Sequence, residues 1–378
     1  MKRSILLKSY LLAVILLLVA CETEEETYVL NPDNIAGEIT SVVNLESDVT
    51  YYLDGNVIVE NGGILNIPAG TQIVVRGGTS SYIAVARGGQ IYATGTASEP
   101  VVFTSDVKTA GSWGGLVICG NAPSNLMTNA SSPVQAEVSD ILYGGDETDD
   151  NSGELSYVRV EYSGYNYDDD KQFNGFSFFG VGSGTIIDHI AAYESKDDGI
   201  EFYGGNVEAN FLVSINCYDD GIDFTDGWQG SGQYWYAYNS AKSGIEGSNN
   251  DNNGAATPTT SAHLSDLTIY KMGERPWYLK KGAGSQWIDN IVIGGLTDNV
   301  GDAYFYYEDN DLNTIANVNA QKIQFSNVRF VNRGDGNTVD ASGTLQVSTN
   351  DNALGAGQWT DSETLEPLWA EGWSQPDN

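Results

Sequence analysis

The chain has 378 residues, and its 51 Asp and Glu residues against 17 Lys and Arg give a formal net charge of −34 at pH 7. Such a charge excludes a nucleic-acid-binding surface, because phosphate contacts need clustered Lys and Arg. It is equally unfavourable for anionic lipid headgroups and polyanionic glycans. The charge is consistent with solubility, with cation binding, or with a neutral or cationic ligand.

Residues 1–20 are typical of a lipoprotein signal peptide. A basic start is followed by an apolar stretch from Leu11 to Val19, which is too short to span a bilayer. The next residues, Leu18-Val19-Ala20-Cys21, resemble the lipobox of bacterial lipoproteins, in which Cys21 becomes the acylated first residue. We therefore expect residues 21–40 to form a lipidated acidic tether.

The acidic run Glu22-Thr23-Glu24-Glu25-Glu26 follows Cys21 directly. It resembles the export signal of surface-exposed lipoproteins of the Bacteroidetes group. This resemblance implies a protein that is lipid-anchored in the outer membrane and faces the cell exterior.

Residues 55–118 contain four glycine-rich or alternating stretches that predict short β-strands separated by tight turns. They are Val57–Thr71, Ile83–Ala93, Gly95–Ser105 and Trp113–Ile118. These stretches resemble the N-terminal coils of right-handed parallel β-helix surface lipoproteins of the Bacteroidetes type. The resemblance implies the fold alone, because that family has no single activity and assigns no catalytic residues.

An internal repeat follows, marked by Gly175, Gly199, Gly221 and Gly244, which are 24, 22 and 23 residues apart. After each of the first three glycines comes an apolar-polar-apolar triplet, which indicates a strand with period two. We predict an all-β, single-stack right-handed parallel β-helix over residues 41–378, with coils of roughly 22–26 residues. The predicted inward columns are Phe176, Ile200, Ile222 and Ile245, and Phe178, Phe202 and Phe224.

Three segments depart from the repeat. Residues 121–154 are rich in Asn, Ser and Asp and predict a loop-rich insertion, and residues 249–260 predict a polar loop. Residues 334–378 lose the period, and Trp359, Trp369 and Trp373 predict a C-terminal cap over the open end. Cys119 and Cys217 lie in apolar runs and are expected to be buried free thiols.

The outward positions of the repeat are acidic. Glu201, Asp223 and Glu246 should form one column, with Asp198 and Asp220 in a second. Like charges about 5 Å apart repel by roughly 1 kcal/mol in water and about 3 kcal/mol at an effective dielectric constant near 20. Four sources of relief are open: full solvation, raised pKa values, pairing with Lys196 and Lys242, or a bound cation. Ca²⁺ is the candidate cation, because it prefers clustered oxygen ligands.

Aromatic side chains near these carboxylates form a candidate ligand-binding set. Rings of this kind stack on sugars, whereas the alternative is that they pack in the core or brace loops. The set is Trp228, Tyr234, Tyr236, Tyr165 and Tyr167.

Catalysis is the less favoured interpretation. Asp219 and Asp220 resemble the double-aspartate motif of polygalacturonases, but the Gly-His-Gly and Arg-x-Lys elements of that family are missing from the sequence. The sequence therefore favours a non-catalytic surface lipoprotein that binds a ligand, a glycan or an outer-membrane protein complex. The alternative is a carbohydrate-active β-helix enzyme, either a polysaccharide lyase or a glycoside hydrolase.

Overall fold

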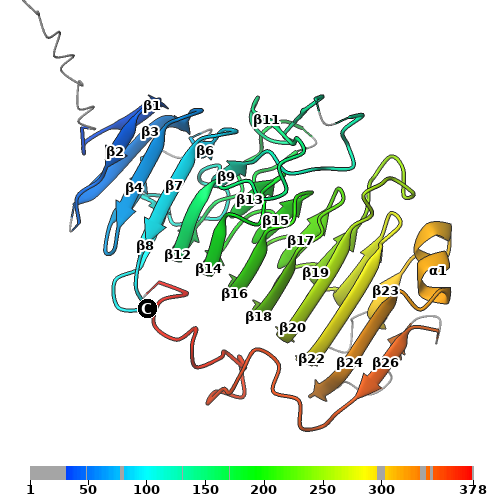
Figure 1. Cartoon of the computed structure of the whole chain (residues 1–378). Helices are drawn as coiled ribbons and strands as arrows, with labels where there is room; N and C mark the ends of the chain where they lie inside the picture. The colour runs from blue at the N-terminus through cyan, green and yellow to red at the C-terminus, as the bar shows by residue number, and fades with distance from the viewer. Residues whose placement is uncertain are drawn as a thin grey trace, which may run out of the picture.

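The computed structural model describes residues 31–47, 49–76, 81–129, 131–169, 171–295, 303–332, 338–340 and 344–376. These residues form the predicted single-stack right-handed parallel β-helix, and 24 strands join in one continuous sheet (Figure 1). The β-helix begins at Ile35, earlier than expected. Cys21 and the signal peptide lie outside the described residues. Within the described part of the chain, no helix is long and apolar enough to cross a membrane.

The coils have three faces, which we name A, B and C. Face A begins with β2 (Val42–Asn44), β4 (Ile64–Pro68) and β7 (Gln90–Thr94). Face B begins with the first half of β3 (Thr50–Val59), β5 (Gln72–Val75) and β8 (Val101–Ser105). Long strands then supply both faces: β12 (Gly153–Glu161), β14 (Ile186–Tyr193), β16 (Glu208–Ile215), β18 (Ser231–Tyr238), β20 (Ser261–Tyr270), β22 (Ser285–Gly294), β24 (Ile323–Val331) and β26 (Gln346–Thr349).

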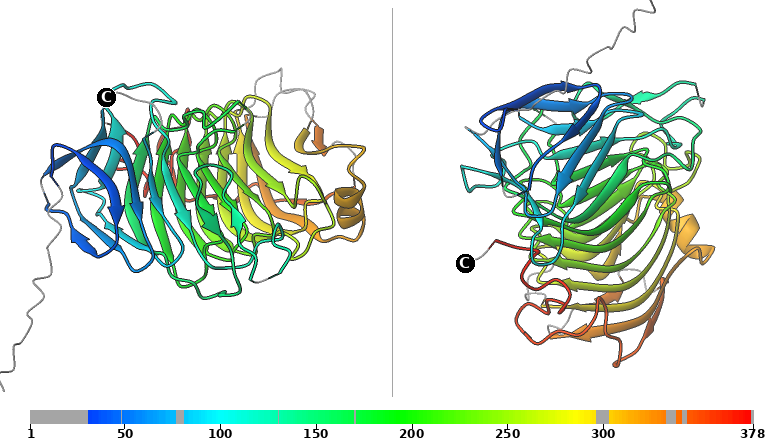
Figure 2. Two further views of the ribbon diagram at one scale, coloured as in Figure 1. Left: turned by 90° about the horizontal axis from the view of Figure 1, so that it is seen from above. Right: turned by 60° about the vertical axis from the view of Figure 1, so that its left-hand side comes forward.

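Face C carries the predicted glycine repeat. It consists of β1 (Ile35–Ile39), the second half of β3, β6 (Ile83–Val85), β9 (Leu116–Cys119), β13 (Phe176–Phe179), β15 (Ile200–Tyr203), β17 (Ile222–Thr225), β19 (Ser243–Ser248), β21 (Arg275–Lys280), β23 (Ala303–Tyr307) and β25 (Thr338–Asp340). The hairpin of β10 (Val134–Gln135) and β11 (Leu142–Tyr143) and the short helix α1 (Leu312–Asn319) lie outside this stack (Figures 1 and 2).

The predicted register of face C is confirmed. Phe176 pairs with Ile200, Ile200 with Ile222, and Ile222 with Ile245. All four are buried in the core. The next partners in this column, Trp277 and Phe305, follow after longer steps than the predicted 22–26 residues, because loops interrupt the later coils. Cys119 and Cys217 are buried free thiols, as expected.

Each of the strands β12, β14, β16, β18, β20, β22 and β24 bends from face A to face B at a residue with positive φ. In four successive coils this residue is Tyr157, His189, Phe211 or Tyr234, with φ between 49° and 61°. The centroids of neighbouring rings are 4.2, 4.1 and 4.7 Å apart, so the four side chains form a continuous outer stack. Stacking of aromatic rings offsets part of the cost of the left-handed backbone.

The C-terminal residues do not cap the open end as predicted. Residues 353–374, which we name the C-terminal strap, run back along the outside of face B (Figure 1). Trp369 and Trp373 pack with their edges against the rings of Phe211 and Tyr157, respectively. The strap packs on face B because the surface around Tyr236 is apolar. Removing this surface from water stabilises the strap in this position.

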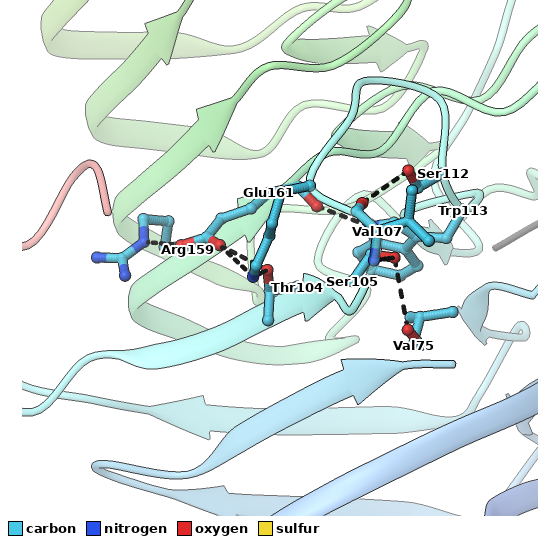
Figure 3. A network of polar contacts seen from close by, with 9 residues as sticks. Val75, Thr104, Ser105, Val107, Ser112, Trp113, Arg159 and Glu161 are labelled. Carbon is cyan, nitrogen blue, oxygen red and sulfur yellow. Dashed lines mark hydrogen bonds and ion pairs between the residues drawn. The ribbon is translucent and has the colours of Figure 1, made fainter. Parts of the chain in front are cut away.

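Arginines hold both ends of the strap. Arg329 Nη1 donates to the carbonyl of Ala353 at 3.3 Å, and Arg159 Nη1 donates to the carbonyl of Trp373 at 2.6 Å. Arg159 also contacts the buried carboxylate of Glu161 through Nε at 2.6 Å, and Thr104 donates to the other oxygen of Glu161 at 2.6 Å (Figure 3). This buried network ties the end of the strap to the N-terminal coils.

Replacing Ile222 with Ala should lower the free energy of unfolding by about 2–5 kcal/mol, because the substitution opens a cavity in a stacked column. Ile186 is a matched control: it lies on face A with 51% of its surface exposed, whereas Ile222 is fully buried. Ile186→Ala should change stability by less than about 0.5 kcal/mol. Urea unfolding followed by circular dichroism measures both, and equal losses would contradict the register.

Candidate metal centre

The predicted acidic column exists on face C. In the register of adjacent strands, Glu201 lies beside Asp223, and Asp223 lies beside Glu246. Ser177 precedes this column and Tyr278 follows it. Because each pair joins equivalent positions of adjacent coils, the three carboxyl groups lie above one another at the spacing of neighbouring strands.

A second acidic row comes from the turns that precede these strands. The backbone N–H of Asp220 donates to Asp198 Oδ1 at 2.8 Å, and that of Ser243 donates to Asp220 Oδ1 at 2.5 Å. Each turn therefore binds the next one through a side-chain carboxyl. This arrangement fixes Asp198 and Asp220 beside the column of Glu201, Asp223 and Glu246.

The carboxyl groups are buried rather than solvated, which excludes free solvation as the source of relief. The five predicted ligands, Glu201, Asp223, Glu246, Asp198 and Asp220, are all 8% exposed or less. Residues of the predicted 121–154 insertion, among them Glu137 and Tyr143, line a pocket of about 440 Å³ over them. Sequence reasoning missed this burial, because the repeat carries no signal of where the insertion folds.

Lysine relieves only part of the charge. Lys242 Nζ lies 2.6 Å from Asp219 Oδ1, as expected for a paired lysine. Lys196 instead donates to Asn166. Lys280, which the sequence did not single out, contacts Glu246. Ten carboxyl groups and three lysines line the pocket, so a large negative excess remains.

Burial and mutual repulsion raise the pKa values of these groups. Burial, followed by the charge of Glu246, raises the pKa of Asp220 to about 7. Burial and the neighbouring Asp219 raise the pKa of Asp197 to about 7. The pKa values of Asp198, Glu201 and Asp223 are raised well above their ordinary values, again chiefly by burial. Without a counter-ion, the pocket therefore favours bound protons.

Glu201 and Asp223 differ in their hydrogen bonds. Glu201 accepts from Asn174 Nδ2 at 2.7 Å and from the hydroxyl of Tyr203. The buried Oδ1 of Asp223 has no hydrogen-bond partner among the residues that the structure describes. A buried carboxylate oxygen without a donor is costly, so this atom points to a missing positive ligand.

Carboxylate oxygens gather closely enough to bind a cation. One oxygen from each of Asp198, Glu201 and Asp223 lies within 4.8 Å of the others, and the same holds for Asp197, Asp198 and Asp219. Two oxygens bound to one Ca²⁺ at 2.3–2.6 Å are at most about 5 Å apart, so the carboxylates fit this ion. Glu246 and Asp220, also predicted as ligands, border these clusters but belong to neither.

The predicted aromatic ligand-binding set does not form one surface. Trp228 is fully buried in the core beside Phe224, and Tyr236 is buried beneath the C-terminal strap. Tyr234 belongs to the outer ring stack. Burial and stacking thus leave Trp228 and Tyr236 no face for a ligand. Tyr165 is half-buried, and Tyr167 is exposed but packs its ring against Phe173.

Asp219 and Asp220, the alternative catalytic pair, have different environments. Asp219 is half-buried and paired with Lys242. Asp220 is buried and held by the backbone of Ser243. Asp197, rather than Asp220, has a carboxylate oxygen within 4.8 Å of one of Asp219, in the group that also contains Asp198.

Three stacked faces around one apolar core define a parallel β-helix protein with an acidic pocket on face C. The model of the pectate-lyase-like β-helix domain family matches residues 37–374, and the chain belongs to this family. No curated protein matches. The crystal structure of the Dettilon tailspike protein is similar at 11% identity and a TM-score of 0.31, over 82% of this chain and 61% of the tailspike chain.

We predict that the cation-free protein loses stability as pH rises from about 4 to about 7. The pKa of Asp220 is about 7 in the fold against 3.8 ordinarily, so its contribution is complete below pH 4 and is lost through pH 7. Asp220→Asn keeps the acceptor for Ser243 and should shrink the difference in melting temperature between pH 4 and pH 7 in EDTA. Exposed Asp309 provides the control, and an equal shrinkage in Asp309→Asn would contradict the prediction.

Proposed function

We propose that this protein is a cell-surface lipoprotein that binds Ca²⁺ in the acidic pocket of face C and uses the loaded pocket to bind a ligand or partner. The observation that supports the cation is the buried Oδ1 of Asp223, which has no donor within the described part of the chain although it lies among other carboxyl groups. Neither Lys242 nor Lys280 lies within hydrogen-bonding distance of this oxygen. A divalent cation would supply the missing positive charge and favour the ionised carboxylates.

Calcium should raise the melting temperature of the EDTA-treated protein, because the unfolded chain scatters these ligands. At a free Ca²⁺ concentration 100 times the dissociation constant, binding adds about 2.7 kcal/mol to the free energy of unfolding. Asp223→Asn should reduce this gain, since it removes the charge while keeping the volume. Differential scanning calorimetry measures the shift. An equal shift with Na⁺ at matched ionic strength would contradict specific binding.

The anchoring part of the proposal rests on the sequence at Cys21 and on the acidic run after it. Cys21→Ser should leave the protein unprocessed or release it from the membrane fraction. Cell fractionation followed by immunoblotting measures this. Protease treatment of intact cells then tests the outward orientation, and complete protection would place the protein on the periplasmic side.

A carbohydrate-active role is the second candidate, and one observation favours it. Carboxylate oxygens of Asp197 and Asp219 lie within 4.8 Å of each other in the half-buried part of the pocket, and the pKa of Asp197 is raised to about 7. Such a group can donate a proton near neutral pH, as a glycoside hydrolase requires. Incubation with neutral and uronic-acid polysaccharides, with and without Ca²⁺, separates the two roles. Release of new reducing ends that Asp197→Asn abolishes would favour the enzyme.

A further inference from the structure

The cation-binding carboxylates form two clusters that share one residue. Asp198 belongs to the group with Glu201 and Asp223 and also to the group with Asp197 and Asp219. We propose that the pocket binds two Ca²⁺ ions, with the carboxylate of Asp198 bridging them. This inference rests on the proposed cation-binding function and specifies the number and sharing of the ions.

The inner subsite consists of Asp198, Glu201 and Asp223. These side chains are at least nine-tenths buried, and the unpartnered Oδ1 of Asp223 belongs to this pocket. The hydrogen bonds from Asn174 and Tyr203 hold Glu201 in place. Because none of the lysines in the described ranges is within ion-pair distance of these three groups, the inner subsite is the tighter one.

The outer subsite consists of Asp197, Asp198 and Asp219. Asp197 and Asp219 are half-buried, and Asp219 is already paired with Lys242. A cation bound here must displace Lys242 from Asp219 or share this carboxylate with it. This subsite is therefore the weaker one. Asp198 belongs to both subsites, and the N–H of Asp220 donates to its Oδ1, which holds this side chain in place.

A single ion cannot take all five carboxylates. Their oxygens fall into two separate groups of three within 4.8 Å rather than into one group of five. Ligands of one Ca²⁺ must lie within about 5 Å of one another, so Asp197 and Asp219 serve a different ion from Glu201 and Asp223. The excess of ten carboxyl groups over three lysines in the pocket is large enough for two divalent charges.

Calorimetric titration of the full-length, EDTA-treated protein with CaCl₂ tests the proposal. We expect two ions per chain, bound with unequal affinity. Asp197→Asn should leave only the tighter step, and Asp223→Asn only the weaker one. Asp198→Asn keeps an acceptor for the Asp220 N–H and should weaken both steps at least tenfold. Asp251 lines the pocket but belongs to neither cluster, so Asp251→Asn should retain two ions.

The outcomes separate the two proposals. One ion per chain in the wild-type protein would overturn the bridged pair and leave the cation-binding function standing. No heat of binding, with a melting temperature that Ca²⁺ does not change, would overturn both. Two steps that Asp198→Asn leaves unaltered would overturn the bridge. Circular dichroism in EDTA checks that each variant is folded, which the loss of like-charge repulsion should favour.

Discussion

The structure depends on one constraint, the stacking of equivalent residues at the spacing of neighbouring strands, about 4.8 Å. Where the repeated residue is apolar, as in the column through Ile222, stacking joins coils that could not bury their own side chains into one core. Where it is acidic, as in the column through Asp223, the same stacking forces like charges together. The core and the candidate site are therefore two results of one geometry.

The folded chain increases the electrostatic cost of the acidic column instead of avoiding it. The insertion that covers face C removes water from the carboxyl groups and adds another, Glu137, near Tyr203. Lys280 compensates one member of the column, Glu246, and Lys242 compensates Asp219, which lies outside the column but lines the same pocket. Stability given up in this way is characteristic of functional sites, where groups are held in place for a ligand.

Local periodicity explains what the sequence could predict. The spacing of Gly175, Gly199 and Gly221 predicted the register of Ile200 with Ile222 and the alignment of Glu201 with Asp223, because both follow from the repeat itself. The burial of the pocket, the role of Lys280 and the course of the strap could not be predicted. Each depends on contacts between segments far apart in the sequence, such as Arg159 with Trp373, which no period encodes.

The strap changes how the solenoid can come apart. An open array of coils has only neighbour-to-neighbour contacts, so it can fray from its last coil inward. Here the last coils are tethered, because the strap runs from Arg329 back to Arg159 and crosses the strands between them. When the final coil detaches, its chain gains little conformational freedom unless the strap also detaches from face B. A linear stack thereby behaves as a closed loop, whose middle coils, those carrying the acidic pocket, open only when the whole loop opens.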